Sequence, residues 1–229
     1  ILSTIEDEFD RVKDVMPCEE NPTRKWFAID FESSLKCVKC GNRLSLPKVT
    51  TYAMYLCIPN DANSNPFTLQ EAVKNYFKEE RTEHKCENML CGNTEKMRSM
   101  YISKLPTVLF LQLGRYSEDG SKRHEIVHVP SELHIPLENI ESSVFMQSDD
   151  ESPKKVSRKL VRYKLVASVC HYGSTLHSGH YVSYVFQNDT QTWYYCDDDV
   201  ITKSCLEMAQ EGSKTSGYCF FYEKIKNSF

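Results

Sequence analysis

Four of the ten cysteines stand in two close pairs, and these pairs constrain the fold more than any other feature. Two residues separate Cys37 from Cys40, which is followed by Gly41, and four residues separate Cys86 from Cys91. Two thiolates on a tight turn can reach one metal ion, and a structural zinc ion takes four such ligands. We therefore predict a structural zinc site that closes the 45-residue excursion between the pairs.

The two pairs also admit other interpretations. Both pairs can remain free thiols, and His84, two residues before Cys86, can replace a cysteine as a ligand. If four protein ligands do bind the ion, no position is left for water, so the metal contributes folding free energy and takes no part in catalysis. The other cysteines are scattered along the chain, at Cys18, Cys57, Cys170, Cys196, Cys205 and Cys219.

The composition and the first residues indicate the environment. The chain has 229 residues, of which 40% are hydrophobic and 26% charged, as in globular domains. Its opening segment, ILSTIEDEFDRVKD, is acidic and amphipathic, so we expect no signal peptide and an intracellular, reducing location in the cytoplasm or nucleus. A net charge of −4 argues against a nucleic-acid partner, and no apolar run is long enough to predict a membrane partner. We expect no organic cofactor.

Hydrophobic periodicity predicts an α+β fold. Residues 3–16 and 68–77 have apolar residues at helical spacing, and most other periodic segments alternate as half-buried strands do. The nearly continuous apolar run at 108–113 is typical of a strand buried on both faces. Residues 141–158 are mostly polar and are expected to form a solvated inserted loop. Two helices and about eight strands predict a domain with an antiparallel sheet.

The most concentrated chemical signal lies in residues 163–200. His180 begins a predicted strand, and Asp197 ends the next one after sixteen intervening residues. Adjacent antiparallel strands bring such ends together, so an aspartate can accept a hydrogen bond from the imidazole and hold it as a general base. Gly179 would let a substrate backbone approach closely. The same residues also fit a surface histidine beside a solvated acidic turn.

At these residues the chain resembles the ubiquitin-specific proteases. Their histidine box has a Tyr-x-Leu strand, a histidine, a glycine, the triplet Gly-His-Tyr and a Trp-x-x-aromatic-Asp-Asp segment. The resemblance covers nearly the whole chain, and the cysteine pairs stand where the family's fingers bind zinc. The matching residues are Tyr163, Leu165, His171, Gly173, Gly179, His180, Tyr181, Trp193, Asp197 and Asp198, together with Leu105, Pro106, Arg115, Tyr116 and the final strand at 217–222.

The resemblance implies a fold and a domain organisation. The family has a papain-like α+β fold of fingers, palm and thumb, with an antiparallel palm sheet and zinc-binding fingers. We expect residues 1–229 to be a partial catalytic domain with the thumb mostly absent. Residues 27–104 would then form the fingers region and residues 105–229 the palm.

The resemblance also implies an activity. Family members hydrolyse the bond after the C-terminal Gly-Gly of ubiquitin, and their partners are ubiquitin and ubiquitinated proteins. By this resemblance His180 is the general base, Asp197 orients it and Asp198 is a second acid. Gly179 and Tyr181 would line the narrow channel for the diglycine.

The family's nucleophilic cysteine has no counterpart in this sequence. In the family it lies in a Gly-Asn-Thr-Cys type of segment, where a helix N-terminus lowers the thiol pKa. Here acidic residues follow Cys18, and Cys170 and Cys196 lie within predicted strands, so none of them is expected to replace it. We expect the nucleophile to lie upstream of Ile1 and the chain alone to be an inactive part of a cysteine-type deubiquitinase.

Two other functions stay open at this point. A fingers-and-palm unit can bind ubiquitin without cleaving it, which would make the chain a non-catalytic ubiquitin-binding module. A zinc-stapled interaction domain unrelated to ubiquitin is the third hypothesis. No residue pattern indicates which ubiquitin linkage or substrate is preferred.

Overall fold

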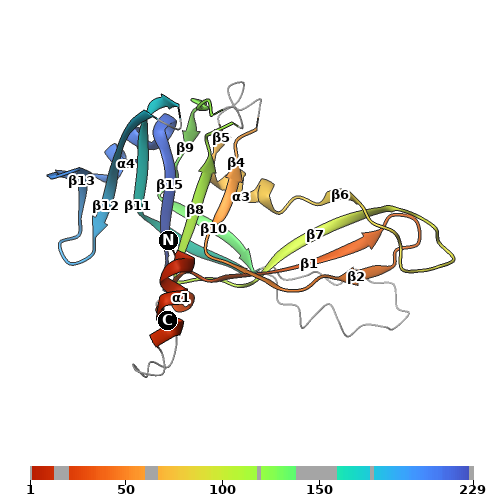
Figure 1. Ribbon diagram of the computed structural model, residues 1–229. Coiled ribbons are helices and arrows are strands. Elements are labelled where there is room, and N and C mark those ends of the chain that lie inside the picture. The colour runs from red at the N-terminus through yellow and green to blue at the C-terminus, as the bar shows by residue number, and fades with distance from the viewer. Residues whose placement is uncertain are drawn as a thin grey trace.

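The computed structural model describes residues 2–12, 21–59, 67–117, 120–137, 159–175 and 178–226. These residues form a body around one large sheet and a narrow arm that extends away from it (Figure 1). The body contains an eight-stranded sheet, and the arm contains a five-stranded sheet. A further short parallel pair joins β5 (Phe67–Thr68) to β9 (Val127–His128).

The body sheet follows the order β14-β13-β12-β11-β15-β8-β4, with β10 paired to β11. Its pairs are antiparallel except β4 and β8, which are parallel. The predicted antiparallel sheet is therefore mixed at one edge, because the chain leaves through the arm between β4 and β8 and returns in the same direction. The strands are β4 Met54–Cys57, β8 Val108–Gly114, β10 Glu132–Leu137, β11 Lys159–Thr175, β12 Ser178–Gln187, β13 Thr192–Asp197, β14 Val200–Ser204 and β15 Gly217–Lys224.

Alternation along the central strands of the body builds the core. Leu109, Leu111 and Leu113 of β8 are fully buried, while the residues between them are only half-buried. The expectation from the sequence, that this run is buried on both faces, is therefore wrong, because one face is fully buried and the other only half-buried. On the less buried face Phe110 stacks on Phe221 of β15, with ring centroids 4.7 Å apart. Burial of each aliphatic side chain contributes roughly 1.5–3 kcal/mol.

The arm places the two cysteine pairs at its far end. Its sheet follows the order β2-β1-β7-β6, with β3 paired to β1. The long strand β1 ends at Cys37, directly opposite Lys96 near the start of β7, so both pairs lie near the tip (Figure 1). The strands are β1 Ile29–Cys37, β2 Arg43–Ser45, β3 Val49–Thr51, β6 Glu80–Glu83 and β7 Glu95–Lys104.

Four helices accompany the sheets within the described ranges: α1 Leu2–Val12, α2 Pro22–Phe27, α3 Leu69–Tyr76 and α4 Leu206–Ser216. Helices α1 and α3 confirm the two predicted ones, although the predicted end of the first, at 13–16, lies outside the described residues. Helix α3 begins with a capping box, in which Thr68 and Glu71 each accept a hydrogen bond from the other's backbone.

Helices α2 and α4 are not predicted from periodicity. Helix α2 has only six residues, and Asn21 caps it by accepting a hydrogen bond from the amide of Thr23. Helix α4 buries small residues, among them Ala209 and Ser213, against the body sheet. Small and polar side chains give no hydrophobic period, so the helix has no sequence signal of the kind that indicates α1 and α3.

Some expectations lie beyond these observations. The polar segment at 141–158 is outside the described residues. The division into fingers at 27–104 and palm at 105–229 stays a prediction, although β4 falls in the first range and pairs in the body sheet.

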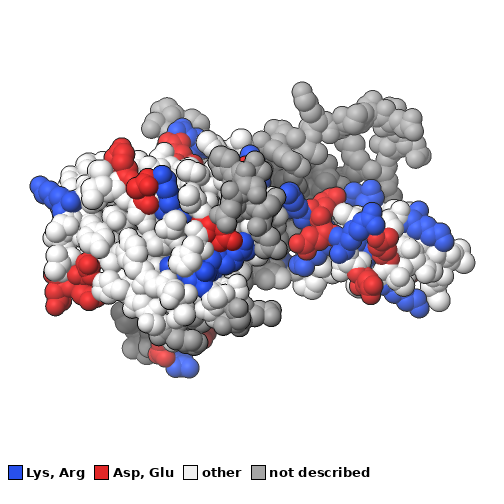
Figure 2. Space-filling view, turned by 90° about the horizontal axis from the view of Figure 1, so that it is seen from above, with Lys and Arg blue, Asp and Glu red and all other residues white. Residues whose placement is uncertain are grey.

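In the described part of the chain, no helix has both the length and the hydropathy needed to cross a bilayer. On the face seen in Figure 2, acidic and basic side chains are interleaved.

Candidate active site and metal centre

His180 and Asp197 meet at the neighbouring ends of β12 and β13. These strands are antiparallel, with Ser183 opposite Cys196, so the start of one lies beside the end of the other. The imidazole Nε2 of His180 and Oδ1 of Asp197 are 2.5 Å apart. The structure therefore brings together the two residues for which the sequence predicts this hydrogen bond. Both side chains remain partly open to solvent, with exposed fractions of 48% and 37%.

Tyr195 also holds Asp197, a contact that is not predicted from the sequence motifs. Tyr195 lies two residues before Asp197 on the same face of β13. Its hydroxyl donates a hydrogen bond of 3.3 Å to Oδ2, the oxygen that His180 does not contact. Each carboxylate oxygen of Asp197 thus has its own partner. The i, i+2 spacing of Tyr195 and Asp197 is the sequence signal that could have found this contact.

Asp198 occupies the turn between β13 and β14. Its φ of 48° lies in the left-handed region, which aspartate tolerates better than most residues. One carboxylate oxygen each from Asp197 and Asp198 and a ring nitrogen of His180 lie within 4.8 Å of one another. The pKa of His180 is raised, mainly by its hydrogen bond to Asp197 and then by the charges of Asp197 and Asp198. The imidazolium is therefore favoured at this site.

Gly179 and Tyr181 flank His180 on the opposite face of β12. Both contact His171 of β11: its ring edge packs against the backbone of Gly179, and its ring centroid lies 4.5 Å from that of Tyr181. A side chain at position 179 would overlap the His171 ring. Tyr181 itself is 49% exposed. The need for glycine at 179 thus has a cause within the fold, besides the substrate approach expected from the sequence.

No thiol accompanies this pair in the described ranges, where Asp197 is the hydrogen-bond partner of His180. Cys170 is fully buried, and its Sγ lies 3.5 Å from the hydroxyl of Ser213 on α4. Burial raises the pKa of the Cys170 thiol, so this thiol is poorly suited to form a nucleophilic thiolate. Cys196 precedes Asp197 and points to the opposite face of β13. Cys18 lies outside the described residues.

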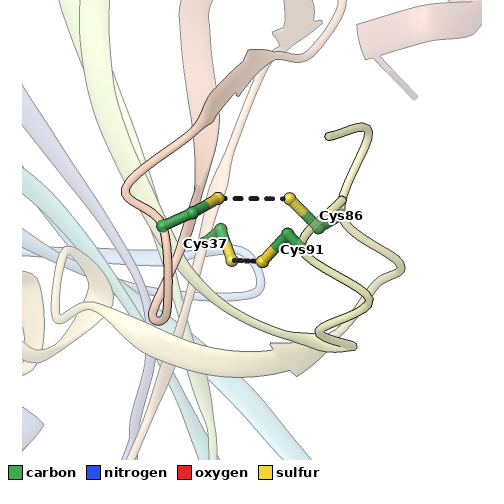
Figure 3. A group of neighbouring side chains, drawn as sticks. Cys37, Cys86 and Cys91 are labelled. Atoms are coloured by element: carbon green, nitrogen blue, oxygen red, sulfur yellow. Dashed lines mark hydrogen bonds between the residues drawn. The ribbon is translucent and has the colours of Figure 1, made fainter. Parts of the chain in front are cut away.

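The second candidate site is a cluster of four cysteines at the tip of the arm. The Sγ atoms of Cys37 and Cys91 are 3.7 Å apart, and those of Cys40 and Cys86 are 3.5 Å apart. All four sulfur atoms lie within 4.8 Å of one another, and Figure 3 shows the labelled side chains converging. The sequence prediction that both pairs reach one point is confirmed. This cluster could hold a metal ion.

Backbone geometry explains why each pair converges. Gly41 and Gly92 follow the second cysteine of their pairs with φ of 74° and 62°, in the left-handed region that glycine adopts readily. The side-chain amide of Asn93 donates to Cys37 Sγ at 3.5 Å, a contact that is not predicted from the sequence. The predicted alternative ligand, His84, is not part of the cluster: its Nδ1 lies 2.9 Å from the carbonyl oxygen of Lys85.

An ion pair between a buried ammonium and a partly exposed carboxylate supports the second cysteine pair. Lys96 of β7 is fully buried, and its ammonium donates to both carboxylate oxygens of Glu87 at 2.7 and 2.6 Å. Glu87 follows Cys86, so this contact ties the turn to the arm's sheet. The backbone amide of Cys40 lowers the pKa of the Cys37 thiol to about 6, whereas burial raises that of Cys86 to about 12. A cation bound here would therefore have to displace protons.

The body sheet, with its paired histidine and aspartate, and the arm, with its cysteine cluster, define the papain-like fold of the ubiquitin-specific proteases. The profile described as "Ubiquitin carboxyl-terminal hydrolase" matches residues 1–222. The chain belongs to this family of thiol proteases.

Several curated relatives share part of the chain. Ubiquitin carboxyl-terminal hydrolase 51 of Mus musculus is 35% identical over 137 residues, which are 57% of this chain and 19% of the relative. Ubiquitin carboxyl-terminal hydrolase 27 of Homo sapiens is 32% identical over 146 residues, which are 58% of this chain and 31% of the relative. The match thus spans less than a third of either relative.

Solved structures share the fold over nearly the whole chain. A chain of the SAGA Ubp8/Sgf11/Sus1/Sgf73 DUB module bound to ubiquitin aldehyde superposes with a TM-score of 0.74 at 22% identity, covering 98% of this chain and 48% of that one. A chain of a SAGA DUB module bound to monoubiquitin gives a TM-score of 0.74 at 21% identity, covering 98% and 47%. At this identity the likeness establishes the fold.

Proposed function

We propose that this chain carries the general base and its orienting acid for a thiol-dependent deubiquitinase. The observation that carries the proposal is the 2.5 Å contact between His180 and Asp197, with Tyr195 on the second carboxylate oxygen. The reaction is hydrolysis of the bond after the C-terminal glycine of ubiquitin. The nucleophilic thiol comes from a segment upstream of Ile1 in the complete protein, and the chain alone is inactive.

The contact with Asp197 supports a separate role for each nitrogen of His180. Asp197 holds Nε2, which leaves Nδ1 as the ring nitrogen that takes the proton from the cysteine thiol. The thiolate attacks the carbonyl carbon, and the imidazolium then gives its proton to the leaving amine as the C–N bond breaks. In the second half His180 takes a proton from water, whose hydroxyl group displaces the thiolate from the acyl group, and the imidazolium then returns that proton to the thiolate. Asp197 and Asp198 stabilise the imidazolium in both halves.

Zinc is the metal that fits the cysteine cluster best. Four thiolates are a typical structural zinc set, with Zn–S bonds of about 2.3 Å. A tetrahedron with such bonds has sulfur atoms about 3.8 Å apart, close to the 3.5 and 3.7 Å contacts between the cysteine pairs. Cys37, Cys40, Cys86 and Cys91 would hold the ion, which would stabilise the arm and take no part in hydrolysis.

Ubiquitin is the proposed partner, since the chain belongs to this family and the likeness in fold extends over body and arm. An electrophilic ubiquitin probe labels a reactive thiolate at the site of hydrolysis. It therefore tests whether the nucleophile lies upstream of this chain. We expect no labelling of the 229-residue chain and labelling of the complete protein on its upstream cysteine. Labelling of a cysteine within this chain would contradict the proposal.

The second candidate function is ubiquitin binding without cleavage. It is favoured by the observation that His180 has Asp197, and no thiol, as its hydrogen-bond partner in the described ranges. Titration of isotope-labelled ubiquitin with the folded chain measures binding directly. Binding by the chain, combined with an inactive complete protein, would select this second function. Spectra of ubiquitin that stay unchanged at high concentrations of folded chain would count against both functions.

A further inference from the structure

His171 is a buried histidine to which the proposed chemistry gives no role. It lies on β11 and is only 2% exposed, although a neutral imidazole is a polar group. The hydroxyl of Tyr116 lies 2.6 Å from its Nδ1, and the ammonium of Lys122 contacts its backbone carbonyl. Burial lowers the pKa of His171 and raises that of Tyr116 to about 12, so the ring stays neutral and accepts the tyrosine's proton in a hydrogen bond.

His171 contacts the two neighbours of His180 on the opposite face of β12. Successive residues of a strand point to opposite faces, so Gly179 and Tyr181 share the face that His180 does not use. His171 is the residue opposite Tyr181 in the strand register. Its ring fills the space beside the Gly179 backbone and contacts the Tyr181 ring. One side chain therefore braces β12 immediately before and immediately after His180.

We propose that His171, held in orientation by Tyr116, is a positioning residue that fixes the β12 backbone at His180 and so keeps its imidazole on Asp197. The proposal rests on the proposed role of His180 as the general base. His171 acts through the backbone of the neighbouring strand, since its ring lies on the opposite face from that imidazole.

Several features connect Tyr116 to this role. Its ring also contacts Tyr218 of β15, with centroids 5.6 Å apart, and its backbone bridges to Lys122. These contacts fix Tyr116 from two further segments, so its hydroxyl has a defined direction. A hydroxyl held in a fixed direction orients the His171 ring more firmly than packing alone. The hydrogen bond selects one tautomer and one of the two ring orientations. Tyr116 and His171 would thus hold in place the strand that carries the proposed base.

The experiment compares Tyr116→Phe and His171→Phe with the parent chain. The first variant removes only the donor, and the second keeps a ring but removes the acceptor. NMR titration of the His180 imidazole is the readout, because a merely structural contact would not shift that titration. We expect the His180 pKa to fall toward the ordinary histidine value in both variants, since the contact with Asp197 loosens. Tyr101→Phe is the control, because it removes a tyrosine hydroxyl that bonds Glu32 in the arm.

The complete protein supplies the second readout. Both variants should lower kcat for a ubiquitin conjugate about tenfold and leave KM nearly unchanged, because the base is misplaced while the binding surface is kept. Folded variants with an unchanged His180 titration would overturn the positioning role. A complete protein that is inactive without any mutation would instead contradict the proposed function, and the NMR result on the chain would still decide the role of His171.

Discussion

Tyr195 and Asp197 lie two residues apart on one face of β13, and the tyrosine hydroxyl donates to Asp197 Oδ2 at 3.3 Å. The other oxygen of Asp197 contacts His180 Nε2. A carboxylate held at both oxygens cannot rotate freely, so the direction in which it presents Oδ1 is fixed. Tyr195 therefore restrains the orientation of the aspartate that we propose orients the general base.

Tyr195→Phe should weaken catalysis without abolishing it. The substitution removes one hydrogen bond to a carboxylate, which contributes about 1.5 kcal/mol, so kcat of the complete protein should fall roughly tenfold. Steady-state kinetics on a ubiquitin conjugate measures the effect. Tyr194→Phe is the matched control, since it removes a hydroxyl from the opposite face of the same strand. Equal losses in the two variants would argue that the Tyr195 contact has no orienting role.

The His180–Asp197 pair should make stability depend on pH. The raised pKa of His180 means that the folded chain binds this proton more tightly than the unfolded chain. The stabilising contribution is therefore fully present below the ordinary histidine pKa of about 6.5 and is lost as pH rises through the higher folded pKa. Asp197→Asn should lower the urea midpoint at acidic pH, and its difference from the parent should shrink at alkaline pH.

Asp189→Asn is the control for this pH series. Asp189 is an exposed acid between β12 and β13, so its loss removes a charge near the same hairpin without touching His180. Its urea midpoints should run parallel to those of the parent. A constant gap between Asp197→Asn and the parent at every pH would mean that the histidine does not titrate against this aspartate.

Much of the fold follows from the sequence, for physical reasons that can be named. The alternation of Tyr163 and Leu165 indicates β11, because both are buried between less buried neighbours, but further along the strand the buried positions shift to Ser168 and Cys170, which the sequence pattern does not predict. Helix α4 has no such signal, since it packs through small side chains. The parallel pairing of β4 with β8 is equally hidden, because the choice of strand partner depends on contacts between distant segments.

Arg115 should be a main determinant of stability in the body. It is fully buried, and its guanidinium donates to four backbone carbonyls, those of Gly217, Lys214, Glu125 and Arg123, at 2.6–3.2 Å. Burial lowers the Arg115 pKa to about 10, which leaves it charged at neutral pH. Arg115→Met leaves these buried acceptors unpaired and should lower the free energy of unfolding by about 3 kcal/mol.

Arg162→Met provides the matched comparison for Arg115. Arg162 pairs with Glu132 on the surface, where its side chain is 51% exposed. Exposed pairs contribute about 0–1 kcal/mol, so this variant should unfold close to the parent in denaturant. Equal denaturant midpoints for the two arginine variants would contradict the proposed contribution of the buried Arg115 hydrogen bonds to stability.

Zinc should hold the tip of the arm. Elemental analysis of the purified chain should find about one zinc ion per molecule, and Cys37→Ser should release it. Loss of the metal should lower the melting temperature and speed hydrogen exchange in β1 and β7 before the body strands. Cys57→Ser is the control, because Cys57 is an exposed thiol on β4 outside the cluster. A metal-free preparation that melts like the parent would contradict the zinc proposal.

The sequence predicts some residues of the two candidate sites and not others. His180 and Asp197 could be paired because strand ends and a short turn bring them together, and the four cysteines because pair spacing predicts convergence. Tyr195 and Asn93 could not, since hydroxyl and amide side chains have many possible partners and their contacts depend on final side-chain positions. Sequence motifs thus locate the proposed catalytic and metal-binding residues, whereas the residues that orient them are identified only from the folded structure.

The most direct test of the central claim is turnover of a ubiquitin–fluorophore conjugate. We expect no enzymatic turnover by the 229-residue chain, because we propose that it supplies a base and an orienting acid while the nucleophile comes from outside it. Adding the upstream segment, in the same chain or as a separate piece, should restore turnover, and His180→Ala should abolish it. Robust turnover by the chain alone that alkylation blocks, or restored turnover that survives His180→Ala, would contradict the proposed roles of His180 and of the upstream cysteine.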